Sequence, residues 1–472
     1  MVKVKRTGKR TARQGGRGKL SDTMRHPKIT PDTPHTECSE RLTAFGGLLA
    51  LVKFLDLIGF EELFAEHYAD PKRGPKLGSY RMTLGILMLL FIGFQRLGQF
   101  AYIRTDSMVC GILRVGILPA VSTFWRYLTS LTINQSASLL KLGAALRAKV
   151  WELCGYAPRR VTVNINTTVS TVYGAIEGAR KGHNTKHRGK KGLRPVLCFL
   201  AETREYLCGT QRRGETMSSE EVARQILQFR RLLPEVVREV RVHGDGECIG
   251  WERIKACLDK GFLFTFGNKR CAPPFPKKGW CRHGEHEYNE CVYQPQGWEQ
   301  PCRFVVMRIH KDHRGDRQLR LLEHYAYRVF ATNEKARPHR VIEAYDQRAD
   351  VENLIIGEAQ REGVLAIPSK HFQAHHAFFQ IVMLAYNLWR WMKLLAGHDE
   401  QQTLHGQEVP EAQRITMPDH TIRIARLKML FVAAKIRFHG NRDEVCYSVH
   451  EQRAAGLRDF LDYLDVRRKE AA

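Results

Sequence analysis

The sequence lacks the features that mark secreted and membrane proteins. Twelve cysteines in 472 residues are too few for a disulfide scaffold, and the N-terminus carries no apolar signal-peptide core. The longest apolar run, Leu84–Phe94, is too short to cross a bilayer as a helix. These absences predict reduced thiols, no membrane partner and a cytoplasmic, nucleoid-associated location.

Acidic residues are also few compared with basic residues. The chain has 49 Asp and Glu against 75 Lys and Arg, which gives a formal net charge of +26. Such an excess points to a polyanionic partner, most simply nucleic acid, with an anionic membrane surface as the competing interpretation. The 43% hydrophobic content excludes a disordered chain, and the length suits about three domains.

Part of the positive charge is concentrated at the N-terminus. Residues 1–38 are basic at their start and contain no acid before Asp22. This composition cannot form a core, so we expect a disordered tail. The tail either contacts phosphate groups without reading sequence or is simply solvated.

Residues 39–155 have apolar residues at helical spacing and predict a helical DNA-binding domain. Leu118-Pro119 is followed by Ser122 and Thr123, a good helix start. This helix could be the second of a helix-turn-helix, with Arg126 facing DNA. Since any helical domain contains such turns, an ordinary packed helix is the alternative.

Residues 156–260 predict the first part of an α/β domain. Apolar and polar residues alternate along Val161–Gly174, so we expect a central strand. The glycine-rich segment Arg180–Arg194 follows, with seven basic residues and no acid. We interpret it as a flexible loop that clamps the phosphate backbone, or else as a solvated loop. The clamp residues are Lys186, Arg188, Lys190 and Lys191.

Two later segments carry further candidate chemistry. Strand-like Val236–Val242 ends at Asp245, which stands between two glycines. The end of a strand is where α/β sheets place functional residues, although Asp-Gly is also ordinary turn sequence.

Residues 261–330 are rich in aromatic residues, Pro and Cys and predict a β-rich insertion. Its cysteines and histidines match no standard zinc spacing.

The segment Ala344–Gly363 predicts a helix within residues 331–395, followed by a C-terminal helical region at 396–472. Tyr345, Arg348 and Glu352 lie at i, i+3 and i+7 and therefore share one helix face. A hydroxyl, a guanidinium and a carboxylate together suit a phosphate and a metal ion. A solvated polar face is the alternative.

These pieces together resemble the insertion-sequence DDE transposases of the branch with a Tyr-x2-Arg-x3-Glu signature. Tyr345, Arg348 and Glu352 have that spacing, and the order of the other matching stretches agrees over roughly Arg160–Leu395. The resemblance implies an α/β fold, an RNase H-like mixed sheet flanked by helices, with a β-rich insertion and a preceding helical DNA-binding domain. The other matching stretches are STVYGAIEGARKGHN, LAETREYLCG, Gly244-Asp245-Gly246 and RVFATN.

The resemblance also implies a chemistry and a set of partners. Three carboxylates of the family bind two Mg²⁺ ions, which serve an in-line displacement at phosphorus. The implied catalytic positions are Asn166, Asp245 and Glu352, while Tyr345 and Arg348 contact phosphate. The implied partner is double-stranded DNA with terminal inverted repeats, bound by a homodimer. Trp280 or Trp298 is a candidate for stacking on an unpaired base, as a tryptophan of the insertion does in some relatives, but buried aromatic packing is the expected role of each.

The sequence departs from the family at the metal site. Asn166 replaces the first Asp, Asn164 stands where a second is common, and Ala359 replaces the signature's final Lys. An amide offers one neutral oxygen, so only Asp245 and Glu352 remain as anionic metal ligands. We therefore expect a transposase with impaired Mg²⁺-dependent catalysis or, alternatively, an inactive DNA-binding derivative. A basic RNA-binding or structural protein would explain the charge but not the ordered match.

Overall fold

The computed structural model describes residues 29–182, 187–215, 218–246, 249–269, 271–310, 325–359, 363, 366, 368–398, 421–439 and 442–471. The chain divides into two compact units, Met1–Glu40 and Arg41–Ala472. Residues 29–40 of the first unit contain no helix or strand. The basic residues of the predicted tail lie outside the described residues, and all that follows concerns the second unit.

The segment after the first unit is helical apart from one short strand, β1(Arg41–Thr43). Local signals set several helix starts. Asp106 accepts hydrogen bonds from the backbone N–H groups of Met108 and Val109, and Thr132 forms a capping box with Gln135. The helices are α1(Leu48–Leu57), α2(Phe60–His67), α3(Ser79–Ile92), the 3₁₀ helix η1(Leu97–Ile103), α4(Ser107–Ile112), α5(Val121–Ser130) and α6(Ile133–Leu153).

Helix α3 is buried along nearly its whole length. Among the described residues, no single helix is long and apolar enough to cross a membrane. The pair α3 and η1 would be long and apolar enough together, but a bend of 83° separates the two helices.

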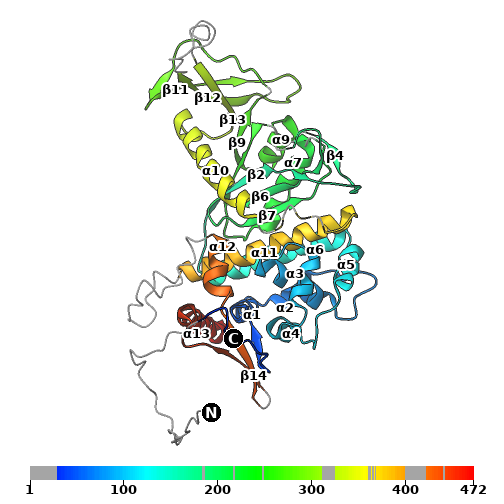
Figure 1. Cartoon of the computed structure of the whole chain (residues 1–472). Coiled ribbons are helices and arrows are strands. Elements are labelled where there is room, and N and C mark those ends of the chain that lie inside the picture. Colours follow the sequence, from blue (N-terminus) through cyan, green and yellow to red (C-terminus); the bar gives the residue numbers. More distant parts are fainter. Residues whose placement is uncertain are drawn as a thin grey trace, which may run out of the picture. The chain divides into compact units, whose positions relative to one another are not determined.

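A large mixed sheet forms one half of the second unit, with helices on its faces (Figure 1). Its strand order is β10-β11-β12-β13-β9-β8-β2-β6-β7. β2 and β9 run parallel to β8, and the other neighbours are antiparallel. The predicted α/β class, a mixed sheet flanked by helices, is thus confirmed. The strands are β2(Arg160–Thr167), β6(Val196–Leu200), β7(Tyr206–Thr210), β8(Glu239–Gly244), β9(Leu263–Asn268), β10(Cys281–His283), β11(His286–Tyr293), β12(Cys302–His310) and β13(Tyr325–Thr332).

The predicted β-rich insertion belongs to this same sheet. β13 pairs with β9, for example Phe330 with Gly267, and β9 pairs with β8. Strands β9 to β13 therefore extend the central sheet from one edge. Figure 1 shows this extension beyond β9, next to α10(Pro338–Ala359).

The basic segment Arg180–Arg194, predicted as a flexible loop, contains two short strands. β4(Arg180–Lys181) and β3(Ser170–Thr171) both pair with β5(Lys191–Leu193). The glycines permit close backbone contact: a Cβ on Gly214 would stand 2.2 Å from the Gly192 carbonyl oxygen. The loop prediction is therefore wrong for these strands, because the glycines serve packing between backbones as well as turns.

The C-terminal region is not helical throughout, contrary to the prediction from its sequence. After α12(Ile422–Ala425) and the π helix η8(Arg426–Leu430), strands β14(Ala434–His439) and β15(Arg442–Tyr447) form a hairpin, and α13(Gln452–Ala471) ends the chain. β14 also pairs with β1, from the opposite end of the unit. This long-range pairing explains why the prediction of a helical region at 396–472 fails at β14 and β15.

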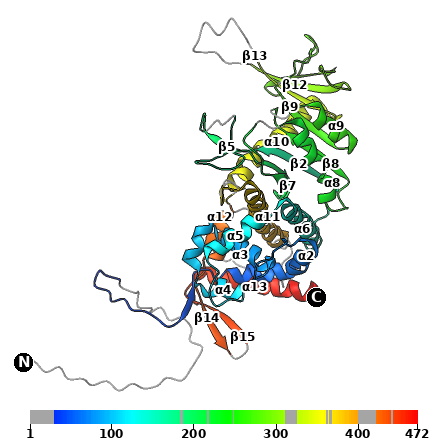
Figure 2. The same cartoon turned by 90° about the vertical axis from the view of Figure 1, so that its right-hand side faces the viewer.

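Helix α11(Phe372–His398) lies between the sheet and the N-terminal helices in both views (Figures 1 and 2). On one side Trp389 stacks on Phe91 of α3, with ring centroids 4.0 Å apart. On the other side the Asn387 amide accepts from the Tyr206 N–H and donates to the Tyr206 carbonyl, both at 2.8 Å. One long apolar helix thus joins the two halves of the unit. The remaining helices are α7(Ser219–Ile226), α8(Phe229–Leu232) and α9(Trp251–Asp259).

A buried ion pair makes a second connection between the helices and the sheet. Arg147 of α6 donates from Nε to Glu205 Oε2 at 2.8 Å, and both side chains are 1% exposed. Trp151 donates to the other oxygen of Glu205 at 2.8 Å. The remaining Arg147 nitrogens donate to the carbonyls of Leu232 and Tyr206. Every charged atom of the pair is therefore hydrogen-bonded, as burial of a charge requires.

This connection predicts a large loss of stability in Arg147→Met. The variant leaves the Glu205 carboxylate buried without its counter-ion, so we expect the free energy of unfolding in urea to fall by about 3–5 kcal/mol. The matched control is Arg160→Met, which breaks the exposed pair with Glu239 and should cost less than about 1 kcal/mol. Equal losses in the two variants would contradict a structural role for the buried pair.

Candidate active site

The candidate site begins at the adjacent ends of the parallel strands β2 and β8. Asn164 is in register with His243 and Ile165 with Gly244. The next residues along the two strands are Asn166 and Asp245, both half-buried. Neighbouring strands lie about 4.8 Å apart, so the structure brings these two predicted catalytic residues together at one place in the sheet.

Helix α10, which carries Glu352, is attached to these strand ends by two side chains. Tyr345 donates its hydroxyl hydrogen to the Gly244 carbonyl at 3.1 Å. Arg348 donates to the Tyr345 hydroxyl at 2.7 Å and to the Ile165 carbonyl at 3.1 Å. These hydrogen bonds join α10 to the residues directly before Asn166 and Asp245. The Glu352 side chain itself lies outside the described residues.

Tyr345 and Arg348 therefore act in this structure as internal positioning residues. Both are buried, at 8% and 6% exposure. Hydrogen bonds from a guanidinium to main-chain carbonyls are stronger than neutral ones, so the pair holds β2, β8 and α10 in one arrangement. The predicted phosphate contacts of these two side chains stay predictions.

The Asn166 side chain already has a partner within its own strand. Its Oδ1 accepts from the Thr167 N–H at 2.7 Å. A neutral amide oxygen engaged in this way is a poor substitute for a carboxylate as a ligand of a hard dication. Across the described residues, no three His, Cys, Asp or Glu side chains are grouped to hold a metal ion. The donor set near Asn166 thus fits Mg²⁺ only in part, with Asp245 as its described anionic ligand.

A cavity of about 220 Å³ opens under α10, next to these strand ends. Asn164 is 4% exposed, and neither its Oδ1 nor its Nδ2 has a hydrogen-bond partner among the described residues. The buried Nε2 of His243 also has no hydrogen-bond partner among the described residues. Buried polar atoms without partners are costly, so these atoms mark the cavity as a place where a polar group or water can bind. The lining residues are Thr162, Asn164, Ala201, Glu202, Arg241, His243, Ala344, Gln347 and Arg348.

Charged groups of both signs line the cavity, namely Arg241, Arg348 and Glu202. Burial, followed by the nearby charges of Arg241 and Arg348, lowers the pKa of His243 to about 3. Arg241 pairs with Glu334 at 2.9 Å, and Glu334 also accepts from the Thr265 hydroxyl at 3.1 Å. The imidazole of His243 is therefore held neutral beside two guanidinium groups.

Arg241 and His243 were not predicted from the sequence as site residues. A signal was available, because Arg241, His243 and Asp245 alternate along β8 and its end and therefore share one face. It was hidden by the interpretation of residues 243–246 as a turn. Polar residues such as these are common in any sequence. Only their burial in the folded protein marks them as residues of a site.

The other predicted DNA-binding residues lie on separate elements. Arg126 is exposed on α5 and donates to Thr123 at 3.4 Å. Arg188 and Lys190 are exposed before β5, and Lys191 is its exposed first residue. Lys186 lies outside the described residues. The structure thus brings together the candidate residues of β2, β8 and α10, and leaves these exposed cations on surfaces of their own.

The two tryptophans considered for base stacking both contact other side chains of the protein. Trp298 packs on Trp251 and on Phe304, with both pairs of ring centroids 5.9 Å apart. The guanidinium of Arg308 lies 4.1 Å above the ring of Trp280. Internal packing, the expected role, describes Trp298 in particular.

The cysteines of the β-rich segment behave as ordinary core and surface groups. Cys302 is buried and donates to the Thr332 carbonyl at 3.7 Å. Burial raises the pKa of its thiol to about 12, whereas zinc binds the thiolate. The zinc interpretation therefore gains no support from Cys302.

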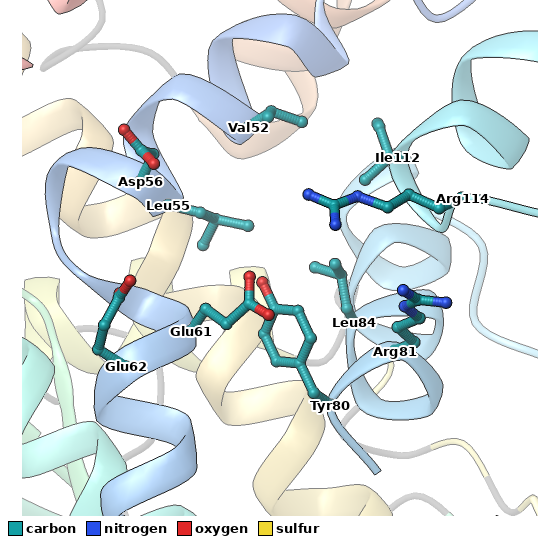
Figure 3. Close-up of a pocket in the computed structure, with 10 residues that line it drawn as sticks. All are labelled: Val52, Leu55, Asp56, Glu61, Glu62, Tyr80, Arg81, Leu84, Ile112 and Arg114. Atoms are coloured by element: carbon teal, nitrogen blue, oxygen red, sulfur yellow. The ribbon is translucent and has the colours of Figure 1, made fainter. Parts of the chain in front are cut away.

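A second cavity, of about 190 Å³, lies among the N-terminal helices. Figure 3 shows the carboxylates of Asp56, Glu61 and Glu62 on one side and Arg81 and Arg114 on the other. Burial, with the nearby Glu61 and Glu62, raises the pKa of Tyr80, which also lines the cavity, to about 12. The cavity contains none of the predicted site residues.

The neutral state of His243 predicts a pH dependence of stability. Its pKa falls from 6.5 to about 3 in the folded protein, so below pH 6.5 the unfolded chain binds a proton that the native chain excludes. The contribution of neutral His243 to the free energy of unfolding is therefore fully present above pH 6.5. It is lost as the pH falls toward 3, by up to about 1.4 kcal/mol per pH unit. His376, with a pKa lowered to about 4 by burial, acts in the same direction.

We expect His243→Asn to reduce this slope in urea unfolding between pH 4 and 6.5, and the exposed control His450→Asn to leave it unchanged. The slope should not vanish in His243→Asn, because His376 still contributes. Identical slopes in wild type and His243→Asn would show that the imidazole is not held neutral.

Comparison with known proteins identifies the family. The model of the family described as "Transposase DDE domain group 1" matches residues 37–465. A search of curated proteins gives no match. A cryo-EM structure of the piggyBac transposase synaptic complex with hairpin DNA is 10% identical over 89% of this chain and 85% of that chain. Its TM-score of 0.41 is too low to support an argument. The family match spans most of the sequence, and the chain belongs to the transposase DDE domain group 1 family.

Proposed function

We propose that the chain is a DNA transposase of the bacterial insertion-sequence type whose catalytic step is weakened at its own metal site. It binds the ends of a mobile element and, in an intact site, catalyses Mg²⁺-dependent strand cleavage and transfer. The observation that carries the proposal is the meeting of Asn166 and Asp245 at the ends of β2 and β8, beneath the helix that carries Glu352.

The finer description of the fold belongs to this proposal. β2 has antiparallel β6 and β7 on one side and parallel β8 on the other, an order that supports an RNase H-like catalytic domain. The helices before β2 are proposed to bind DNA, with Arg126 on the exposed face of α5. Strands β9 to β13 form the proposed insertion.

Asp245 and Glu352, with the carbonyl oxygen of Asn166, would hold two Mg²⁺ ions, which polarise the phosphate and activate the attacking oxygen. The protein's own contribution is positional. Tyr345 and Arg348 fix the strand ends that carry two of these ligands. The Asn166 oxygen already accepts a hydrogen bond from the Thr167 N–H, which leaves one lone pair of this neutral oxygen for a metal ion.

The proposed partner is double-stranded DNA with terminal inverted repeats. The net charge of +26 and the exposed cations Arg188, Lys190 and Lys191 support contacts to the phosphate backbone. Joining two element ends requires two copies of the chain, so we propose a homodimer on DNA. A nucleoid location would follow from this partner.

A catalytically inactive DNA-binding derivative is the second candidate. The observation that favours it is the pair of amides at Asn164 and Asn166, which removes two negative charges from one strand. Two dications would then face one described carboxylate, Asp245, and the carboxylate of Glu352 on α10. These two carboxylates would offset the Coulomb repulsion between the two ions only weakly.

Restoring the carboxylate should distinguish the two candidates. We expect Asn166→Asp to raise the rate of strand cleavage on DNA with the element's terminal repeats by at least about 100-fold in Mg²⁺, because it adds an anionic ligand. Mn²⁺, which accepts nitrogen and neutral oxygen ligands more readily, should reduce the difference.

The matched controls are Asn164→Asp, which places a carboxylate two residues away in the same strand, and the double variant Asn166→Asp with Asp245→Asn. Both should remain slow. Cleavage by the unmodified chain at the rate of Asn166→Asp would overturn the proposed weakness. DNA binding without cleavage in every variant would favour the inactive derivative.

The basic segment predicts the salt dependence of DNA binding. Replacement of Arg188, Lys190 and Lys191 by Ala should lower the slope of log K against log salt by about 0.9 for each phosphate that the variant no longer neutralises. The charge-matched control replaces the exposed Lys72, Arg73 and Lys76 by Ala. The same reduction in both triple variants would show that bulk charge, and not a clamp, determines the slope.

A further inference from the structure

A groove of about 510 Å³ lies at the junction of three segments that are distant in sequence. One is helix α5, the second is the turn after β3, and the third is the segment just before α11. The groove is separate from the cavity at Asn164 and shares no lining residue with it. Its lining residues are Trp125, Ile176, Pro368, Ser369, Lys370 and His371.

The walls of the groove are fixed by hydrogen bonds. The Glu177 N–H donates to the Lys370 carbonyl at 3.1 Å, and the Glu177 carboxylate accepts from the Phe372 N–H at 2.9 Å. Gly178 has a φ of +77°, and a Cβ at this position would stand 2.8 Å from the Phe372 ring. Glycine therefore permits the close approach of these two segments, and the groove is preformed.

Trp125 is the feature of the groove that the fold does not explain. It is 41% exposed, whereas the other six tryptophans are buried or half-buried. Its neighbours Phe124, Tyr127 and Leu128 form the packed face of α5, so Trp125 lies on the opposite side together with Arg126. Its ring centroid is 6.4 Å from that of His371. An indole left partly in water at the edge of a groove is typical of a binding surface.

The chemistry of the lining matches one class of ligand. A nucleobase offers a flat aromatic face to the indole and the imidazole, and its flanking phosphates are anionic. Lys370 in the groove and Arg126 beside Trp125 are both exposed cations. Aromatic stacking combined with nearby positive charge is how proteins bind unpaired nucleotides.

We propose that this groove binds an unstacked base of DNA, with the base on Trp125 and its flanking phosphates near Lys370 and Arg126. The proposal rests on the proposed function, since it needs DNA as the substrate. It assigns base stacking to Trp125 in the helical part of the chain, in place of Trp280 or Trp298. A fully paired duplex must first unstack a base to fill the groove, which costs free energy and weakens its binding there.

The test compares two duplexes of the same terminal-repeat sequence, one fully paired and one with a single unpaired base near its end. We expect wild type to bind the second duplex more tightly and its tryptophan fluorescence to be quenched, because Trp125 is the exposed indole. Trp125→Leu should lose about 10-fold or more in affinity for the duplex with the unpaired base, while its affinity for the paired duplex is unchanged. Trp125→Phe should retain part of the preference.

Trp280→Leu is the matched control and should keep both the preference and the quenching. Loss of the preference in Trp280→Leu but not in Trp125→Leu would overturn the assignment. Equal affinity of wild type for the two duplexes would overturn the groove proposal while leaving DNA binding intact. Failure of wild type to bind either duplex would reject the proposed function, and the groove proposal with it.

Discussion

The buried ion pair between Arg147 and Glu205 is the constraint on which the arrangement of this protein depends. Two charges removed from water are tolerated only when every donor and acceptor is satisfied. Trp151 and the carbonyls of Tyr206 and Leu232 meet that condition. The requirement fixes α6 against β7, and through the sheet it fixes β6 and then β2. The position of the candidate site is thus set by a pair of residues that take no part in it.

The same requirement, that buried polar groups have hydrogen-bond partners, is met only in part around the candidate site. Tyr345 and Arg348 donate to the carbonyls of Gly244 and Ile165, near the ends of β8 and β2. The amide of Asn164 and the imidazole of His243, however, keep buried polar atoms without partners in the described part of the chain. The hydrogen bonds of Tyr345 and Arg348 thus hold the strand ends together beside buried polar groups that the described residues leave without partners.

Amides and carboxylates at positions 164 and 166 would have opposite effects on folding and on metal binding. Clustered carboxylates repel one another when no metal is bound, and the amides Asn164 and Asn166 avoid that repulsion. Carboxylates, by contrast, supply the negative charge that dications require. Stability of the free protein and metal binding would therefore favour different side chains at these two positions.

Much of the local structure was determined by the sequence alone. The alternation in Val161–Gly174 predicted β2, although that strand ends at Thr167 and β3 belongs to another sheet. The spacing of Tyr345, Arg348 and Glu352 predicted one helix, which α10 confirms. Both patterns follow from backbone periodicity. Tertiary structure decided the rest. Arg348 meets Ile165 across 183 positions, and Trp125 meets His371. Such contacts depend on how elements pack, and burial then turns an ordinary Asn164 or His243 into a residue of a site.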